Sequence, residues 1–228
     1  VLTVIEGPIY SARFFYNLER ETAPFDYSFL PKGAGPRVSP KTKFRAYIPS
    51  QPFSGKERVV SNFRNKKYLT LISVNKRIHR LKRFYVHVMN TLRPFPSFVD
   101  RELCRDRLEV VRYFSQNPEF DLYGHGWDQP IRYENARYED AVRRSYRGEV
   151  AAKLPTLKKY KFSICFENCI FDGYVTEKII DSLFAGCVPV YWGAPDITKY
   201  IPKDCFVDFR DFKSYEEQKP SLNPPFSS

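Results

Sequence analysis

The sequence predicts an α/β protein in which helices cover both faces of a parallel sheet. Short apolar runs such as "KYLTLISVN" (67–75) and "KFSICFEN" (161–168) alternate with amphipathic helical patterns such as "TEKIIDSLFAG" (176–186). Strands and helices that alternate in this way are typical of parallel sheets. With 43% hydrophobic residues in 228, the chain can fill one large packed core or two small ones.

The N-terminal part predicts two strands followed by a long linker. "VLTVIE" (1–6) has the pattern of a buried strand, and "FDYSFLP" (25–31) that of a second strand after a polar helical stretch. Residues 32–65 are rich in proline, glycine and basic residues and show no sustained period, which indicates loop and linker. We therefore predict a partial N-terminal domain with its linker over 1–65 and a second domain over 66–228. Because Val1 opens directly on a strand pattern, we expect residues to be missing before it.

The second domain repeats the alternation of strands and helices. Its predicted strands are 67–75, 120–128, 161–168 and 187–193. Its predicted helical segments are 80–92, 108–116, 154–160, 176–186 and the turn 197–201. The charged stretch 129–149 has few apolar residues, and we assign no element to it.

The charge of the chain favours an anionic partner. The formal net charge is +11, from 37 Lys and Arg against 26 Asp and Glu. Nucleic acid, a membrane surface and a phosphorylated ligand all fit this excess. Nucleic acid is disfavoured because the basic residues are spread through loops and the aromatic residues through strands, instead of interleaving along one groove. The five cysteines form no CxxC pair, so we expect buried free thiols instead of a zinc site.

Polar residues follow the strands at the edge where parallel sheets bind ligands. Glu167 and Asn168 end one predicted strand, and the glycines at 124–126 and 193 end two others. Thr176 is a candidate N-cap of the next helix. Glu177 and Lys178 would then lie in its first turn, beside backbone N–H groups that favour anions such as a diphosphate.

Each of these residues also has an ordinary structural interpretation. Lys178 could be a solvated side chain on a surface helix, although a lysine at a helix N-terminus is unfavourable without an anion. Glu177 could complement the helix dipole or accept hydrogen bonds from ribose hydroxyls. Tyr174 could pack over the core or contact a nucleotide. The residues alone leave these alternatives open.

Metal ligands are not evident in the sequence. No Asp-x-Asp pair occurs that could hold a metal against a diphosphate, and the three histidines show no ligand spacing. We therefore expect no obligatory metal or other cofactor.

Three segments together resemble the family 10 fucosyltransferases. They are "YKFSICFEN" (160–168), "GYVTEKIIDSLFAGCVPVYWGAP" (173–195) and "YIPKDCFVDFRDF" (200–212). The resemblance is strong over roughly 160–212 and weaker in the strands at 67–75 and 120–128. It implies a GT-B architecture, in which two Rossmann-like domains with parallel sheets face across a cleft, with the acceptor domain incomplete in this chain.

The resemblance also implies a reaction and roles for named residues. The expected enzyme is an inverting fucosyltransferase that moves fucose from GDP-fucose to a hydroxyl of an acceptor oligosaccharide, α-1,3 to GlcNAc. Asn168 and Tyr174 would contact the donor, Glu177 the ribose and Lys178 the diphosphate, and Glu167 is counted with these donor-binding residues. An arginine from the helix after the first strand of the second domain is expected on the phosphates, and Arg80 is preferred over Arg77 and Arg83.

Glu6 matches the proposed general base of the family, at the end of the first strand. The chain departs from the family pattern at both ends, because most of the acceptor domain is absent and the tail 218–228 replaces the usual final helices. The alternative function is therefore a truncated domain that binds GDP-fucose without transfer.

The absence of Asn-x-Ser/Thr sequons favours a bacterial protein in the cytoplasm or peripheral on the inner membrane, where the basic surface could contact anionic lipid. The alternative location is the Golgi membrane, with this part in the lumen.

Overall fold

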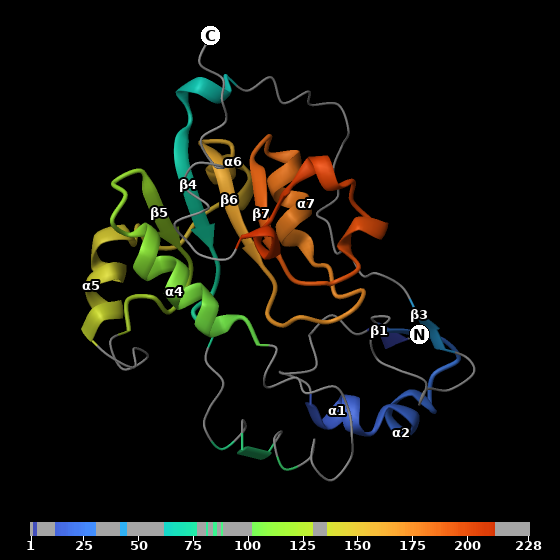
Figure 1. Ribbon diagram of the computed structural model, residues 1–228. Helices are drawn as coiled ribbons and strands as arrows, with labels where there is room; N and C mark the ends of the chain where they lie inside the picture. Colours follow the sequence, from blue (N-terminus) through green and yellow to red (C-terminus); the bar gives the residue numbers. More distant parts are fainter. Residues whose placement is uncertain are drawn as a thin grey trace.

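The computed structural model describes residues 2–3, 12–30, 42–44, 62–76, 81, 84–85, 88, 102–129 and 136–212. These residues form a three-stranded sheet with the order β1-β2-β3 and a five-stranded sheet with the order β5-β4-β6-β7-β8 (Figure 1). Every strand pair in both sheets is parallel. The predicted α/β class is thus confirmed, and two parallel sheets in one chain fit the GT-B expectation.

The N-terminal part contains one strand that the sequence did not predict. Its elements are β1 (Leu2–Thr3), α1 (Ala12–Tyr16), α2 (Leu18–Thr22), β2 (Ser28–Leu30) and β3 (Thr42–Phe44). Strand β3 lies within the stretch 32–65 that was assigned to loop and linker, so that assignment was wrong at this point. Three residues are too few to show a period of two, and β3 is specified by its backbone pairing with β2.

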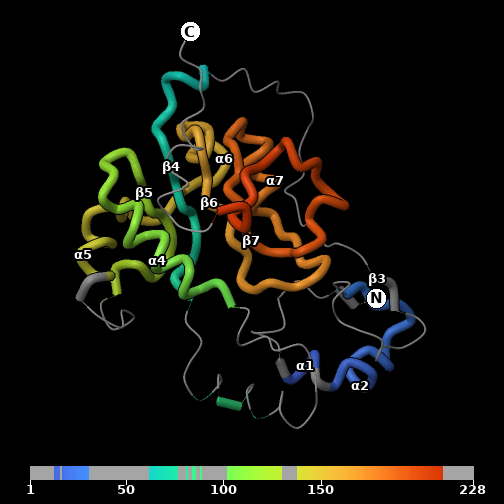
Figure 2. The backbone as a smooth tube through the Cα atoms, viewed as in Figure 1, coloured from blue at the N-terminus to red at the C-terminus, as the bar shows by residue number. Residues whose placement is uncertain are grey.

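The five-stranded sheet carries the remaining elements, traced from teal (β4) to red in Figure 2. Its strands are β4 (Lys67–Ile72), β5 (Phe120–Tyr123), β6 (Tyr160–Phe166), β7 (Val188–Trp192) and β8 (Val207–Asp208). The α-helices are α4 (Cys104–Phe114), α5 (Ala136–Ser145), α6 (Lys153–Leu157) and α7 (Glu177–Phe184). Short 3₁₀ turns occur at η2 (Phe63–Asn65), η4 (Ile197–Lys199), η5 (Lys203–Cys205) and η6 (Phe209–Asp211). The predicted helix 80–92 lies mostly outside the described residues, although Phe84 and Tyr85 are helical. The domain boundary near Asn65 stays a prediction.

Helices cover both faces of this sheet, as predicted. Along β6, Phe162, Ile164 and Phe166 point to a core shared with α4 and α5. Cys165 points to the opposite face, where it packs in a core with Ile179 of α7. Successive side chains of a strand point to opposite faces, so β6 is buried on both sides and appears in the sequence as an almost continuous apolar run.

Helix α5 corrects a second prediction, because the charged stretch 129–149 was assigned no element. Its apolar positions Tyr138, Ala141 and Val142 are three and four residues apart and are buried against the sheet core. The residues between them are mostly charged, and this lowers the hydrophobicity of the segment as a whole. A narrow apolar stripe was therefore enough to bury the helix.

Helix α7 ends where the sequence predicted. Gly186 adopts a positive φ of 63°, the left-handed conformation that glycine allows at a helix end. The buried Lys66 donates from Nζ to the carbonyl oxygen of Gly186 at 2.6 Å, which adds a positive charge at the negative end of the helix. The cysteines are free thiols, four of them buried and Cys205 exposed.

A buried carboxylate links residues near the amino ends of strands β4, β5 and β6. Asp121 on β5 has a fully buried side chain that accepts hydrogen bonds from Lys67 Nζ at 2.8 Å and Arg147 Nε at 2.8 Å. Tyr160 donates its hydroxyl to the same carboxylate at 2.6 Å. Burial alone would raise the pKa of Asp121, but the hydrogen bonds from Lys67 and Tyr160 and the two positive charges lower it.

We expect Asp121→Asn to lower the free energy of unfolding at pH 7 by about 1–3 kcal/mol, since charge-assisted hydrogen bonds are lost. The depressed pKa of Asp121 means that its contribution is complete above the unfolded value near 3.9 and is lost as pH falls through the folded value. The difference between wild type and variant should therefore shrink below about pH 4. Urea denaturation at several pH values measures it. The exposed Asp140 offers Asp140→Asn as a control, and a gap that stays constant down to pH 2 would contradict the expectation.

Candidate functional site

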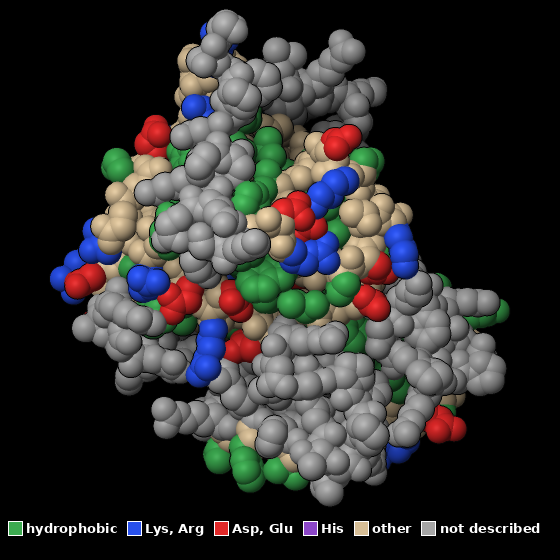
Figure 3. Space-filling view, in the orientation of Figure 1, with side chains coloured by type: hydrophobic (Ala, Val, Ile, Leu, Met, Phe, Trp, Pro, Cys, Tyr) green, Lys and Arg blue, Asp and Glu red, His purple; other side chains and the backbone are tan. Residues whose placement is uncertain are grey.

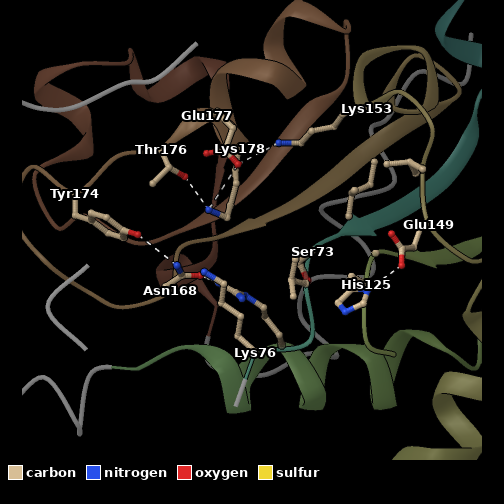
Figure 4. A pocket seen from close by; sticks show the side chains of 15 residues that line it. Ser73, Lys76, His125, Glu149, Lys153, Asn168, Tyr174, Thr176, Glu177 and Lys178 are labelled. Carbon is tan, nitrogen blue, oxygen red and sulfur yellow. Dashed lines mark hydrogen bonds and ion pairs between the residues drawn. The ribbon is translucent and has the colours of Figure 1, made fainter. Parts of the chain in front are cut away.

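A pocket of about 510 Å³ opens at the carboxyl edge of the five-stranded sheet, where doubly wound folds bind ligands. The ends of β4, β5 and β6 form its floor, and the start of α7 forms one wall (Figure 4). Its lining residues are Ile72, Ser73, Val74, Lys76, Arg107, Gly124, His125, Glu149, Val150, Lys153, Asn168, Tyr174, Thr176, Glu177 and Lys178.

The floor depends on a close contact between two strand ends. Gly124 follows β5 with a φ of 124°, and a side chain there would overlap the backbone of Ser73 after β4. Glycine is required here both because it adopts this positive φ readily and because it has no Cβ atom to collide with Ser73. The backbone of β5 can therefore come against Ser73 at the pocket.

Lys178 lies in the first turn of α7 with its ammonium at the pocket wall. Its Nζ lies 2.7 Å from Thr176 Oγ1 and 3.0 Å from Glu167 Oε2, and its side chain is 16% exposed. Thr176 precedes the helix as its N-cap residue with extended backbone angles, as predicted. Its hydroxyl is not used to cap α7. It bridges Glu167 and Lys178 instead.

Glu167 lies beneath the pocket lining and is fully buried. Its carboxylate accepts hydrogen bonds from the Thr176 backbone N–H at 2.8 Å, the Thr176 hydroxyl at 2.7 Å and Lys178 Nζ at 3.0 Å. Gly193 leaves the space for this side chain, because a Cβ atom there would overlap Glu167 Cγ and the hydroxyl of Tyr191. Glu167, which the sequence analysis counts with the donor-binding residues, therefore contacts the pocket lining through Thr176 and Lys178.

Arg107 of α4 is the basic residue that the sequence analysis missed. Its guanidinium is buried, with the residue 3% exposed, and Nη2 donates to the carbonyl oxygens of Phe166 and Glu167 and to Asn168 Oδ1 at 2.7 to 3.0 Å. Within the described residues it forms no ion pair with a carboxylate, and its Nε–H has no hydrogen-bond partner. A buried positive charge without a counter-charge at a pocket wall is suited to an anionic ligand.

Asn168 and Tyr174 extend the wall beyond Arg107. Because Arg107 holds Asn168 Oδ1 at 2.8 Å, the amide of Asn168 directs Nδ2 toward the Tyr174 hydroxyl, 3.4 Å away. The loop between them also contacts the N-terminal part, since Phe171 packs edge to face on Phe15 of α1 with ring centroids 6.0 Å apart. The loop at this end of the pocket therefore packs against the part of the chain that was assigned to the acceptor side.

Glu177 lies between two lysines, Lys153 and Lys178. Lys153 of α6 donates from Nζ to Glu177 Oε1 at 3.3 Å and forms an ion pair with the buried Asp181 at 2.7 Å. Burial opposes ionisation of Glu177, but the charges of Lys178 and Lys153 lower its pKa overall. Glu177 is thus an ionised hydrogen-bond acceptor at the pocket wall, as recognition of a hydroxyl group requires.

Four of the predicted site residues line this single pocket: Asn168, Tyr174, Glu177 and Lys178. Glu167 lies directly behind them. Glu6 and Arg80 fall outside the described residues. Arg107 belongs to a helix between the first two strands of the sheet, which is the region where the sequence predicted an arginine, but it was not among the three arginines considered.

In the part of the chain that the structure describes, no three His, Cys, Asp or Glu side chains are grouped to hold a metal ion. None of the described helices has the length and apolar character needed to cross a membrane. On the face shown in Figure 3, basic and acidic side chains of the described residues are interspersed.

The fold and the pocket define an α/β protein with cationic and acidic residues gathered at the carboxyl edge of a parallel sheet. Residues 98–223, more than half of the chain, match the glycosyltransferase family 10 (fucosyltransferase) C-terminal domain. The chain belongs to this family.

Relatives with curated names include fucosyltransferases from bacteria and animals. The chain is 36% identical to alpha-(1,3)-fucosyltransferase FucT of Helicobacter pylori, over 46% of this chain and 22% of the relative. It is 41% identical to 4-galactosyl-N-acetylglucosaminide 3-alpha-L-fucosyltransferase 9 of Mus musculus, over 49% of this chain and 27% of the relative. It is 36% identical to human GDP-fucose protein O-fucosyltransferase 3, over 43% and 19%. The chain therefore spans about a quarter or less of the length of these relatives.

A crystal structure of an alpha1,3-fucosyltransferase with GDP-fucose also matches. The identity is 24% and the TM-score 0.42, over 72% of this chain and 36% of that chain.

Proposed function

We propose that this chain forms the donor-binding part of a fucosyltransferase that uses GDP-fucose. The observation that carries the proposal is the pair of cations at one pocket: Lys178 in the first turn of α7, and the buried Arg107, which has no carboxylate partner among the described residues. A diphosphate there would meet the backbone N–H groups of a helix start and two positive charges. We infer the rest of the donor, fucose and guanine, from membership of the fucosyltransferase family.

The proposed reaction is transfer with inversion at the fucose carbon. The hydroxyl oxygen of the acceptor would form a bond to C1 of fucose while the bond from C1 to the phosphate oxygen breaks and GDP leaves. Lys178 and Arg107 would stabilise the negative charge that develops on the leaving diphosphate. The ionised Glu177 would accept hydrogen bonds from ribose hydroxyls, and Asn168 and Tyr174 would contact the donor at the end whose loop packs against α1. Glu6 would take the acceptor proton, a role that rests on the resemblance alone.

For the acceptor we propose a glycan, with fucose joined α-1,3 to GlcNAc. The named relatives include both a glycan-modifying enzyme and a protein O-fucosyltransferase. A disaccharide such as N-acetyllactosamine and an unglycosylated protein acceptor are therefore the two substrates to compare. A domain that binds GDP-fucose without transfer remains the alternative function. A bacterial location in the cytoplasm or on the inner membrane surface stays a proposal from the sequence, with the Golgi as its alternative.

Calorimetric titration with GDP tests the donor site, and we propose that no metal is required. We expect GDP to bind with the same affinity, within twofold, in EDTA and in excess Mg²⁺, because Lys178 and Arg107 supply the positive charge. UDP and ADP serve as controls for the base. Binding that disappears in EDTA and returns with Mg²⁺ would contradict metal independence, and the absence of GDP binding under both conditions would contradict the proposed function.

A further inference from the structure

We propose that Glu167 is a positioning residue that fixes the ammonium of Lys178 at the pocket wall. A role of Glu167 in donor binding rests on the proposed function, whereas its contacts with Thr176 and Lys178 do not. Glu167 is fully buried and does not line the pocket, yet its carboxylate receives hydrogen bonds from two residues that do, Thr176 and Lys178.

The geometry is that of a closed ring. Glu167 Oε2 is 2.7 Å from Thr176 Oγ1 and 3.0 Å from Lys178 Nζ, and these two atoms are themselves 2.7 Å apart. Oε1 accepts the backbone N–H of Thr176 at 2.8 Å. An ammonium has three N–H donors, so two are used in the ring and one is left to point toward a ligand. The long lysine side chain is therefore held in one conformation before the ligand arrives.

Two opposing effects follow from the charge of Glu167. The carboxylate holds Lys178 in place, which lowers the entropy lost when the lysine binds a phosphate. It also partly neutralises the lysine and repels the phosphate itself. We infer that positioning is the larger effect, because Glu167 is separated from the pocket by the residues it holds, whereas its contacts to Lys178 and Thr176 are direct.

Glu177 does not perform this task. Its Oε1 is 4.0 Å from Lys178 Nζ, beyond hydrogen-bond distance, and the same oxygen accepts from Lys153 at 3.3 Å. Thr176 takes part in the ring, but its hydroxyl carries no charge. Within the described residues, Glu167 is therefore the carboxylate that holds Lys178 by a hydrogen bond.

The first measurement requires no nucleotide. Lys178 is acetylated with a neutral acetylating reagent, and its modification rate is followed by peptide mass spectrometry. In Glu167→Gln the amine loses its anionic partner, so the rate at Lys178 should rise at least fivefold relative to the other lysines. Thr176→Val, which removes only the hydroxyl from the ring, should raise it less, about twofold. An unchanged rate at Lys178 in folded Glu167→Gln would overturn the proposal.

The second measurement is a double-mutant cycle for GDP binding. Lys178→Met should weaken GDP binding about 10- to 100-fold, in the range for a lost charge-assisted hydrogen bond. Glu167→Gln should weaken it about 5- to 10-fold in the wild-type background and cause no further loss in the Lys178→Met background. Equal losses in both backgrounds would show a general structural role, and tighter binding in both would show that repulsion dominates. Either result would overturn the proposal.

Asp208→Asn is the matched control for removing a buried carboxylate. The side chain of Asp208 is 5% exposed, is paired with Lys203 and Arg210, and does not line the pocket. This variant should lower stability without changing GDP affinity or the acetylation of Lys178. If wild type does not bind GDP, the proposed function fails, and the acetylation rates still decide whether Glu167 holds Lys178.

Discussion

Replacing Arg107 by methionine is expected to weaken GDP binding by about 100-fold. Methionine occupies a similar volume but removes the buried positive charge that has no carboxylate partner among the described residues. A loss of this size corresponds to about 2.7 kcal/mol, within the range for a hydrogen bond to a charged group. Asn168 also loses the donor that orients its amide, so its contacts should weaken together with those of the arginine. Calorimetry with GDP measures the effect.

Two further variants separate binding from folding. Arg112 lies on the same helix and pairs with Glu109 at a part-exposed position, so Arg112→Met removes an arginine from α4 without touching the pocket. Its GDP affinity should equal that of wild type. Arg107→Lys keeps the charge but not the fork of donors, and it should fall between wild type and Arg107→Met. If folded Arg107→Met binds GDP within twofold of wild type, Arg107 has no part in donor binding.

Glu6→Gln is expected to lower kcat by about 10² to 10⁴, the usual contribution of general-base catalysis. Glutamine keeps the shape of the side chain but cannot accept the proton of the acceptor hydroxyl. GDP affinity should not change, because the proposed donor contacts come from the second domain. The assay measures fucose transfer from GDP-fucose to N-acetyllactosamine in the full-length natural protein.

A control for this experiment is Glu19→Gln, which removes an exposed carboxylate from α2 and should keep normal kcat. The pH profile gives a second criterion. Loss of the base should remove the acidic limb of the kcat profile, because that limb reports protonation of the group that takes the proton. Normal kcat with an unchanged profile in Glu6→Gln would assign the proton to another residue.

Most of the five-stranded sheet could be predicted from the sequence, for a physical reason. Strands such as β6 are buried on both faces, so their sequences are continuous apolar runs that differ from the helical pattern of α7. Helix α5 was missed because three apolar positions, Tyr138, Ala141 and Val142, are enough to bury it on one side. Strand β3 was missed because its identity depends on pairing with β2, which local sequence does not contain.

The sequence was also sufficient to place several residues of the candidate site. Topology and the start of α7 were enough to bring Asn168, Glu177 and Lys178 to one edge of the sheet. Arg107 was missed because the helix was predicted to begin only at residue 108. Extending the same helical period back to Cys104 places Arg107 on the buried face of α4 and Arg105 on the exposed face. The sequence also could not show that the side chain of Glu167 is buried behind the pocket. This placement depends on the space that Gly193 leaves at the end of the neighbouring strand.

The strand order of the five-stranded sheet has a consequence for synthesis on the ribosome. Strand β4 is made first but lies between β5 and β6, and it pairs Leu69 with Phe162 more than ninety residues later. A nascent chain can therefore form the β4–β5 pair early, whereas the other edge of β4 stays open until β6 has left the exit tunnel. An unpaired edge is an aggregation hazard, and contacts this distant in sequence form slowly. Pausing of translation just after β5 should thus leave the chain dependent on chaperones that cover strand edges.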